Sequence, residues 1–153
     1  MIEVGKKAPA FTLESSDGGK VKLADHAGKN VVVYFYPRDN TPGCTREGEA
    51  FRDLHAQFRR AGVVILGVST DSLASHGKFK AKMKFPFELG SDEDHRLAEL
   101  FGTWTEKNMY GRKLMGIERS TFLVDAAGVL RQEWRKVKVD GHAEAVLAAA
   151  RAL

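Results

Sequence analysis

The sequence predicts an α/β fold in which a central mixed β-sheet is flanked by helices and preceded by a β-hairpin. Two continuous apolar runs, VVVYFY at 31–36 and VVILGV at 63–68, are rich in β-branched and aromatic residues. Such runs are typical of strands that are buried on both faces. A helical pattern follows each run, and strands that alternate with helices favour a layered α/β arrangement.

The elements of the first half follow in chain order. Two short runs, Phe11 to Glu14 and Val21 to Leu23, flank a Gly-rich turn and predict the N-terminal hairpin. Pro37 ends the strand 31–36, and a helical pattern begins near Cys44 and stops at Gly62. The strands on either side of this helix are expected to be parallel, with a right-handed connection.

The second half continues the alternation. We expect helices over 72–83 and 92–101, and an irregular stretch rich in Gly, Lys and Arg over 102–118. Two strands at 121–124 and 129–134 then form a second hairpin.

The chain closes with an Ala-rich helix over 142–153. Strand, helix, strand, helix, β-hairpin and helix is the order of a thioredoxin-like fold. We expect one domain over residues 1–153.

The composition is that of an ordinary globular protein. Hydrophobic residues make up 43% and charged residues 29% of the 153 residues, and the formal net charge is +4. The basic residues are spread along the chain, which argues against nucleic-acid binding. No window approaches the ~20 apolar residues of a membrane span, and the N-terminus lacks a signal-peptide pattern. We therefore expect a cytoplasmic protein without a membrane partner.

The chain has one cysteine, Cys44, so an internal disulfide cannot form, and a reducing compartment is expected. The five histidines show no ligand spacing with this cysteine. His55 falls near the same helical face but roughly 16 Å further along the helix, too far for a cysteine–histidine dyad. We expect neither a metal nor a cofactor.

Cys44 follows a loop at the carboxyl end of a buried strand, where open α/β sheets place their active sites. It also opens a helix, whose free N–H groups and dipole favour a thiolate. Arg38 and Arg46 are close in sequence and would add positive potential. The alternative is a buried, inert cysteine.

A fast cysteine enzyme needs more than an ionised thiol. At pH 7, near-complete ionisation speeds attack by only about 30-fold over an ordinary thiol, which is roughly 2 kcal/mol of barrier. Donors that hold the substrate and stabilise its leaving group must supply the rest. Thr41 offers a hydroxyl on the same loop, with a helix N-cap as its alternative role. Pro37 and Pro42 stiffen the loop, and simple turn chemistry is their alternative role.

The stretch YPRDNTPGCT at 36–45 resembles the active-site loop of peroxiredoxins, with its pattern Pro-x-x-x-Thr-x-x-Cys. The sequence TPGCT within this stretch is similar to that of the peroxiredoxin Q group, also called bacterioferritin comigratory proteins. The block GIERSTF at 116–122 matches this group as well, and the resemblance covers nearly the whole chain.

The resemblance implies a role for four residues. Cys44 would be the peroxidatic nucleophile, and Thr41 would bond the peroxide through its hydroxyl. Arg119 would bond both the thiolate and the peroxide oxygens, and Pro37 would shield the sulfur from water. The charge of Glu47, one helical turn after Cys44, would oppose thiolate formation, so we expect it to pair with an arginine; the alternative is a solvent-facing helix residue.

The chain departs from the family in one respect. Many members carry a second cysteine five residues after the first, where Glu49 stands here, and others carry it in the following helix, 72–83, which has none. The resemblance therefore implies a one-cysteine enzyme that reduces hydrogen peroxide and organic hydroperoxides. An external thiol would restore its sulfenic acid: thioredoxin, glutaredoxin or glutathione. The resemblance also implies a monomer, with a dimer as the alternative.

Two other functions stay open at this point. A thioredoxin-type disulfide oxidoreductase normally needs Cys-x-x-Cys, which this chain lacks. A thioredoxin-fold binding protein, acting as a peroxide sensor or holdase, would react once and then stall. Steady-state peroxide consumption separates such a sensor from the enzyme.

Overall fold

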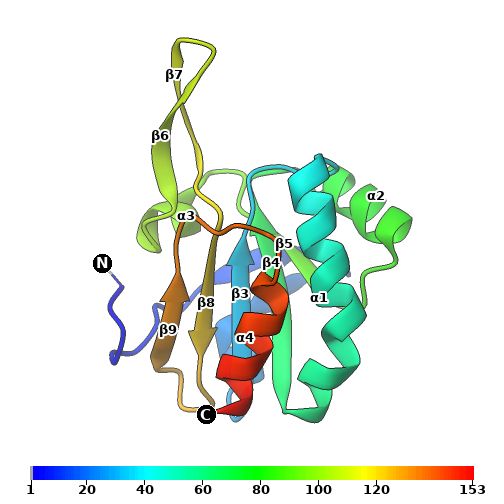
Figure 1. Cartoon of the computed structure of the whole chain (residues 1–153), viewed down its shortest axis with the longest axis vertical. Coiled ribbons are helices and arrows are strands. Elements are labelled where there is room, and N and C mark those ends of the chain that lie inside the picture. Colours follow the sequence, from blue (N-terminus) through cyan, green and yellow to red (C-terminus); the bar gives the residue numbers. More distant parts are fainter. Residues whose placement is uncertain (1) are drawn as a thin grey trace.

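The computed structural model describes residues 2–153, and a seven-stranded sheet forms its centre (Figure 1). The strand order is β2–β1–β5–β4–β3–β8–β9. The strands are β1 (Thr12–Ser15), β2 (Lys20–Lys22), β3 (Asn30–Phe35), β4 (Val63–Ser69), β5 (Glu88–Ser91), β8 (Ser120–Val124) and β9 (Leu130–Trp134). β3, β4 and β5 are parallel, and the other neighbours are antiparallel, so the predicted mixed sheet is confirmed.

Helices cover both faces of this sheet. On one face lie α1 (Pro42–Arg60), α2 (Leu73–Met83) and α4 (His142–Arg151). The other face is covered by α3 (Arg96–Leu100) together with apolar residues from the N-terminal segments. A short 3-10 helix, η1 (Leu23–His26), follows β2. In the described chain, no helix is both long and apolar enough to cross a membrane.

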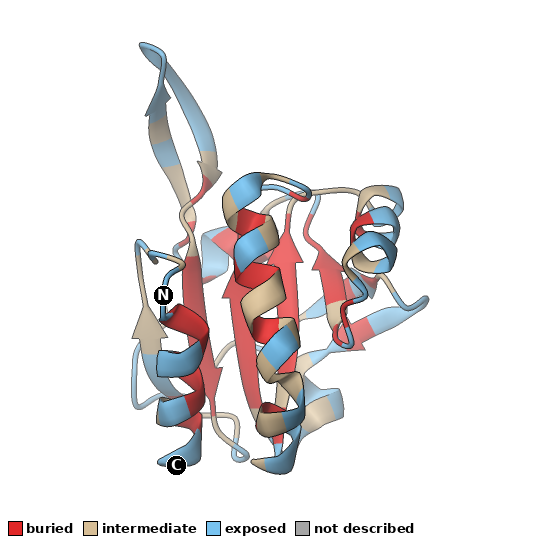
Figure 2. Ribbon diagram, turned by 45° about the vertical axis from the view of Figure 1, so that its right-hand side comes forward, coloured by how far each residue is buried: buried red, intermediate tan, exposed pale blue. Residues whose placement is uncertain are grey.

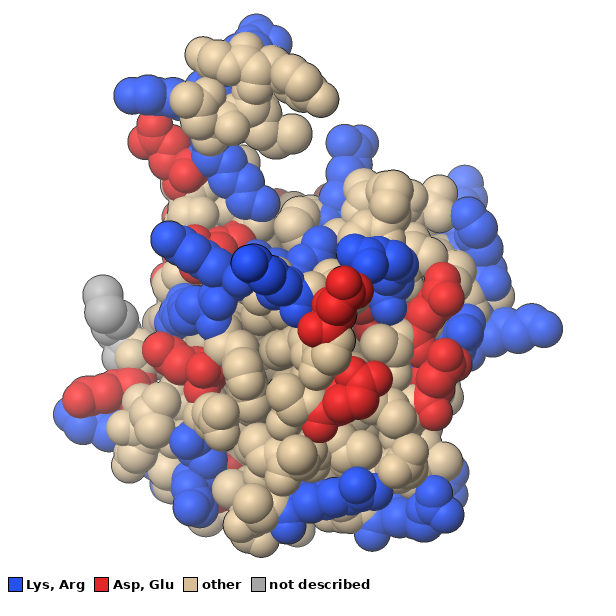
Figure 3. Space-filling view, viewed as in Figure 1, with Lys and Arg blue, Asp and Glu red and all other residues tan. Residues whose placement is uncertain are grey.

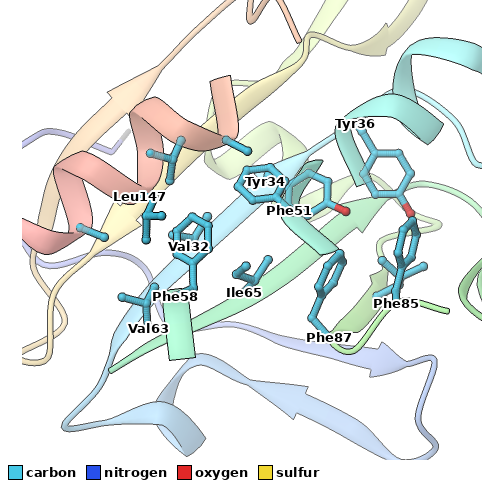
Figure 4. Close-up of a cluster of buried hydrophobic side chains, with 14 of the residues drawn as sticks. Val32, Tyr34, Tyr36, Phe51, Phe58, Val63, Ile65, Phe85, Phe87 and Leu147 are labelled. Carbon is cyan, nitrogen blue, oxygen red and sulfur yellow. The ribbon is translucent and has the colours of Figure 1, made fainter. Parts of the chain in front are cut away.

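Alternate residues of β3 enter two separate cores, which explains its unbroken apolar sequence. The central strands are buried along most of their length (Figure 2). Val32 and Tyr34 pack under α1 and α4 (Figure 4), whereas Val33 and Phe35 belong to the core on the α3 side. All four side chains are almost completely buried. Each such burial stabilises the fold by about 1.5–3 kcal/mol, and together they fix β3 at the middle of the sheet.

The predicted irregular stretch over 102–118 is wrong. The segment is a separate hairpin, formed by β6 (Trp104–Met109) and β7 (Arg112–Ile117), that projects beyond the sheet (Figure 1). Both residues of its turn, Tyr110 and Gly111, have positive φ angles of 54° and 76°. This backbone suits a two-residue hairpin turn, but the strands are largely exposed on both faces and so lack an alternating apolar pattern.

Two further differences lie between α2 and β6. The sequence pattern predicts no strand at Glu88–Ser91, where the structure has β5, a strand of only four residues. α3 begins at Arg96 instead of at the predicted Asp92. The reason is that the Asp92 carboxylate accepts the N–H groups of Leu97 and Ala98, at 3.1 and 2.8 Å, from its position before the helix.

Candidate active site

Cys44 lies in the first turn of α1, directly beyond the carboxyl end of β3, as the sequence predicts. Pro42 is the first helical residue, a position that suits proline because the N–H it lacks would have no helical partner. The free N–H groups of this turn favour negative charge nearby. The Cys44 side chain is only 2% exposed and packs among the aromatic residues under α1.

Arg119 reaches this sulfur from the link between β7 and β8. Its Nη2 lies 3.4 Å from Sγ of Cys44, and its Nη1 lies 2.6 Å from Oε1 of Glu47. The guanidinium also lies against the loop backbone, because a Cβ added to Gly43 would meet Nη2 at 3.1 Å. A cation is thus held at the cysteine by two side chains and by close packing.

Glu47 pairs with an arginine, as expected, and that arginine is Arg119. The carboxyl group is 1% exposed, and its Oε2 has no hydrogen-bond partner among the described residues. Burial raises the pKa of Glu47 to about 7, although the charge of Arg119 beside it acts in the opposite direction. Burial alone would lower the pKa of Arg119, but Glu47 and Cys44 together raise it. The guanidinium therefore remains charged.

Thr41 and Pro37 occupy the same loop as Cys44. Thr41 is the N-cap residue of α1 by its backbone, but its side chain makes no capping bond. Its hydroxyl instead donates to the carbonyl oxygen of Arg38 at 2.9 Å. Pro37 follows β3 after one intervening residue, Tyr36, and is half-buried. Arg46 points away to an exposed ion pair with Asp140, at 3.0 Å.

A buried polar network, which the sequence analysis missed, holds this loop from behind. Asp39 accepts hydrogen bonds from the Tyr36 hydroxyl at 2.6 Å and from the Ser75 hydroxyl at 2.8 Å. Nδ1 of His76, on α2, lies 2.7 Å from the same carboxylate. The backbone N–H of Asp39 donates to Asp71 at 2.8 Å. The loop is therefore tied to α2 and to the segment after β4.

Both ring nitrogens of His76 have partners. Nε2 lies 3.0 Å from the carbonyl oxygen of Gly90, to which it donates because a carbonyl only accepts, and Nδ1 lies beside the Asp39 carboxylate. The carboxylates of Asp39 and Asp71 and the His76 ring lie within 4.8 Å of one another, as metal ligands would, but hydrogen bonds already occupy them.

A second histidine, His142, lies behind Arg119. Burial, together with the charge of Arg119, lowers the pKa of His142 to about 4. The neutral ring is 2.7 Å from the Thr121 hydroxyl. Sequence spacing gave no sign of this residue or of His76, because their neighbours come from distant elements.

Comparison with known proteins decides the family. The family model described as the AhpC/TSA family matches residues 4–133. The chain belongs to the AhpC/TSA family. The peroxiredoxin Bcp of Bacillus subtilis is 54% identical over 92% of this chain and 90% of its own. These findings confirm the resemblance to the peroxiredoxin Q group.

Solved structures of this group have the same fold. Peroxiredoxin Q of Xanthomonas campestris has a TM-score of 0.89 and 54% identity, over 93% of this chain and 90% of its own. A cysteine-to-serine variant of peroxiredoxin Q from Xylella fastidiosa has a TM-score of 0.94 and 41% identity, over 99% and 97%. The thioredoxin-like fold is therefore confirmed, and the chain is a peroxiredoxin, a thiol-dependent peroxidase.

Proposed function

We propose that Cys44 is the peroxidatic nucleophile and that Arg119, Thr41 and Pro37 prepare it and its substrate. The observation that carries this proposal is the 3.4 Å contact between the Arg119 guanidinium and Sγ of Cys44, in the first turn of α1. Positive charge from the arginine and the helix stabilises the thiolate, which is the reactive form. The fixed donors of the guanidinium can then bond the peroxide as well.

The Thr41 hydroxyl complements this arrangement. Because its proton is donated to the Arg38 carbonyl, its lone pairs are left to accept the O–H of a hydroperoxide. The peroxide would thus be held between an acceptor, Thr41, and a donor, Arg119. Pro37 contributes no N–H at this point, so it would keep a competing donor and water away from the sulfur.

The reaction proceeds by displacement at oxygen. The Cys44 thiolate attacks the terminal oxygen of R–O–OH, the S–O bond forms, and the O–O bond breaks. The sulfur is oxidised by two electrons to a sulfenic acid, and the leaving RO⁻ takes up a proton to become ROH. Arg119 stabilises the charge on the departing oxygen, the kind of interaction that contributes most to catalysis. We propose both hydrogen peroxide and organic hydroperoxides as substrates, which agrees with the alkyl peroxide reduction activity named for the Xanthomonas campestris protein.

The sulfenic acid must be reduced by a thiol from outside the chain. Cys44 is the only cysteine, so no internal disulfide can form. Thioredoxin, glutaredoxin or glutathione would supply this thiol, and a cytoplasmic location suits all three. Without one, Cys44 would be oxidised further to the sulfinic acid.

Steady-state peroxide consumption tests the proposal. Wild type and Cys44→Ser are assayed with hydrogen peroxide and each candidate thiol system. We expect turnover in wild type with at least one reductant and none in the variant. Equal turnover in both proteins would overturn the role of Cys44. A single stoichiometric reaction that stalls with every reductant would favour the peroxide sensor instead.

A further inference from the structure

The β6–β7 hairpin rises from the same end of the sheet as the Cys44 loop (Figure 1). Paired residues of the hairpin share a face, so Lys107 and Leu114 lie on one side, and Asn108 and Lys113 on the other. The Lys107 side chain runs back across Gly116. A Cβ added to Gly116 would lie 3.4 Å from Cδ and 3.8 Å from Nζ of Lys107. Lys107 therefore points toward the base of the hairpin, from which the chain continues to Arg119.

Lys107 is half-buried, and its Nζ makes no ion pair or hydrogen bond with any residue described in the structure. Burial lowers the pKa of Lys107, as does the charge of Arg119, while Cys44 and Glu118 raise it. The ammonium group lies beside Gly116, three residues before Arg119 in the chain. By contrast, Lys113 on the other side of the hairpin pairs with Glu106 at 3.8 Å.

Two further lysines approach from the loop between β9 and α4. The N–H of Val137 donates to the carbonyl oxygen of Arg119 at 3.0 Å, which brings this loop to the site. Lys136 and Lys138 flank Val137, both are exposed, and neither forms an ion pair within the described chain. We call Lys107, Lys136 and Lys138 the cationic rim. Lys and Arg side chains gather on this face below the hairpin (Figure 3).

The nearby carboxylates do not neutralise this rim. Glu47 is buried against Arg119, and Asp140 pairs with Arg46 at 3.0 Å. Glu118, next to Arg119, is half-buried, and its charge opposes the lowering of the Lys107 pKa. Three lysines of the rim thus stand against this one carboxylate, which leaves a positive excess beside Arg119.

We infer that Lys107, supported by the rest of the cationic rim, selects an anionic thiol, one that carries a carboxylate, as the reductant of oxidised Cys44. This inference rests on the proposed function and names the chemical class of its reductant. The attacking thiolate RS⁻ forms Cys44–S–SR and expels hydroxide, which a proton converts to water. A second RS⁻ attacks the outer sulfur, forms RSSR and releases the Cys44 thiolate.

A charge series of small thiols tests the inference. The probes are 3-mercaptopropionate, 2-mercaptoethanol and cysteamine, which are anionic, neutral and cationic beyond the thiol itself. The protein is first oxidised with one equivalent of hydrogen peroxide, and the rate of thiol reduction is then measured for each probe. Failure of the first step would contradict the proposed function, and the second step tests this inference alone.

We expect Lys107→Gln to lower the ratio of the rate constants for the anionic and cationic probes by about 3- to 10-fold. Lys107→Arg should restore the wild-type ratio. High salt should reduce the difference between the ratios of wild type and Lys107→Gln. Lys113→Gln is the matched control, because it removes a lysine from the other side of the hairpin, and its ratio should equal that of wild type. A Lys107→Gln ratio equal to wild type, with both proteins folded by circular dichroism, would overturn the inference.

Discussion

At the residue scale, the Arg119 guanidinium performs two tasks through two different nitrogens. One nitrogen contacts Sγ of Cys44 and the other binds Glu47. Lysine would keep the charge at this position but not the fork, so it cannot make both contacts in one geometry. The arrangement therefore depends on the shape of the side chain as well as on its charge.

Substitutions of Arg119 separate the effect of its charge from the effect of its shape. We expect Arg119→Ala to lower the rate of Cys44 oxidation by hydrogen peroxide about 10²- to 10³-fold, since a donor to the transition state is lost. Arg119→Lys should recover only part of that loss. Stopped-flow measurement under single-turnover conditions checks both values. A rate in Arg119→Ala equal to wild type would remove this residue from the mechanism.

Glu47 and His142 make opposite contributions to the pH dependence of stability. The folded-state pKa of Glu47 is about 7, above its ordinary 4.5, so this group lowers the free energy of unfolding as pH rises through that interval. The folded-state pKa of His142 is about 4, below its ordinary 6.5, so this group raises the free energy of unfolding as pH rises from 4 to 6.5. In wild type the two effects largely cancel between pH 4.5 and 6.5.

Replacing Glu47 or His142 alone should reveal the contribution of the other group to the pH dependence of stability. Between pH 4.5 and 6.5, the free energy of unfolding should increase with pH in Glu47→Gln and decrease with pH in His142→Gln, relative to wild type. The limit for each group is about 1.4 kcal/mol per pH unit. Urea unfolding at several pH values measures the slopes. Parallel slopes in the two variants would show that these groups do not titrate as described.

At the element scale, α1 carries Cys44 and is held close to the chain that precedes β5. Gly48 makes this approach possible, because a Cβ added there would clash with the ring of Phe85. Phe85 in turn packs against Phe79 of α2. It also stacks on Phe87, and both of these rings are labelled in Figure 4. The position of the reactive sulfur thus depends on a glycine one turn along the helix.

Gly48→Ala should therefore destabilise the protein by about 1–3 kcal/mol, through overpacking against Phe85. Gly77→Ala is the matched control, since Gly77 also lies in a helix but has nothing within 4 Å of its added Cβ. Alanine has the higher helix propensity, so the control should gain up to about 1 kcal/mol. Denaturant unfolding of both variants checks the difference, and equal stabilities would contradict the packing argument.

The buried elements were predictable from sequence because their side chains must satisfy a core. β3 and β4 stand out as apolar runs, and Phe51 and Phe58 give α1 its period. The β6–β7 hairpin was missed because neither of its faces is covered, so burial leaves no pattern in its sequence. The Asp39–His76 pair was missed for a different reason: the tertiary fold brings together residues 37 positions apart.

At the scale of the whole molecule, the candidate active site also depends on contacts between residues that are distant in the sequence. Chain order places Cys44 at a helix start, but only the fold brings Arg119, 75 residues away, to its sulfur. The resemblance to peroxiredoxins pointed to Arg119, whereas no sequence signal pointed to Lys107. With one cysteine in the chain, we propose that a second molecule completes the catalytic cycle and that the charge around Cys44 influences which molecule reacts.

Intact-mass analysis of reduced protein, followed by peptide mapping, tests the central claim most directly. After one equivalent of hydrogen peroxide, we predict that one oxygen atom is added, that it lies on the peptide containing Cys44, and that a thiol removes it. Protein that stays unmodified while the peroxide persists, or oxygen found on a methionine while Cys44 remains a thiol, would contradict the account.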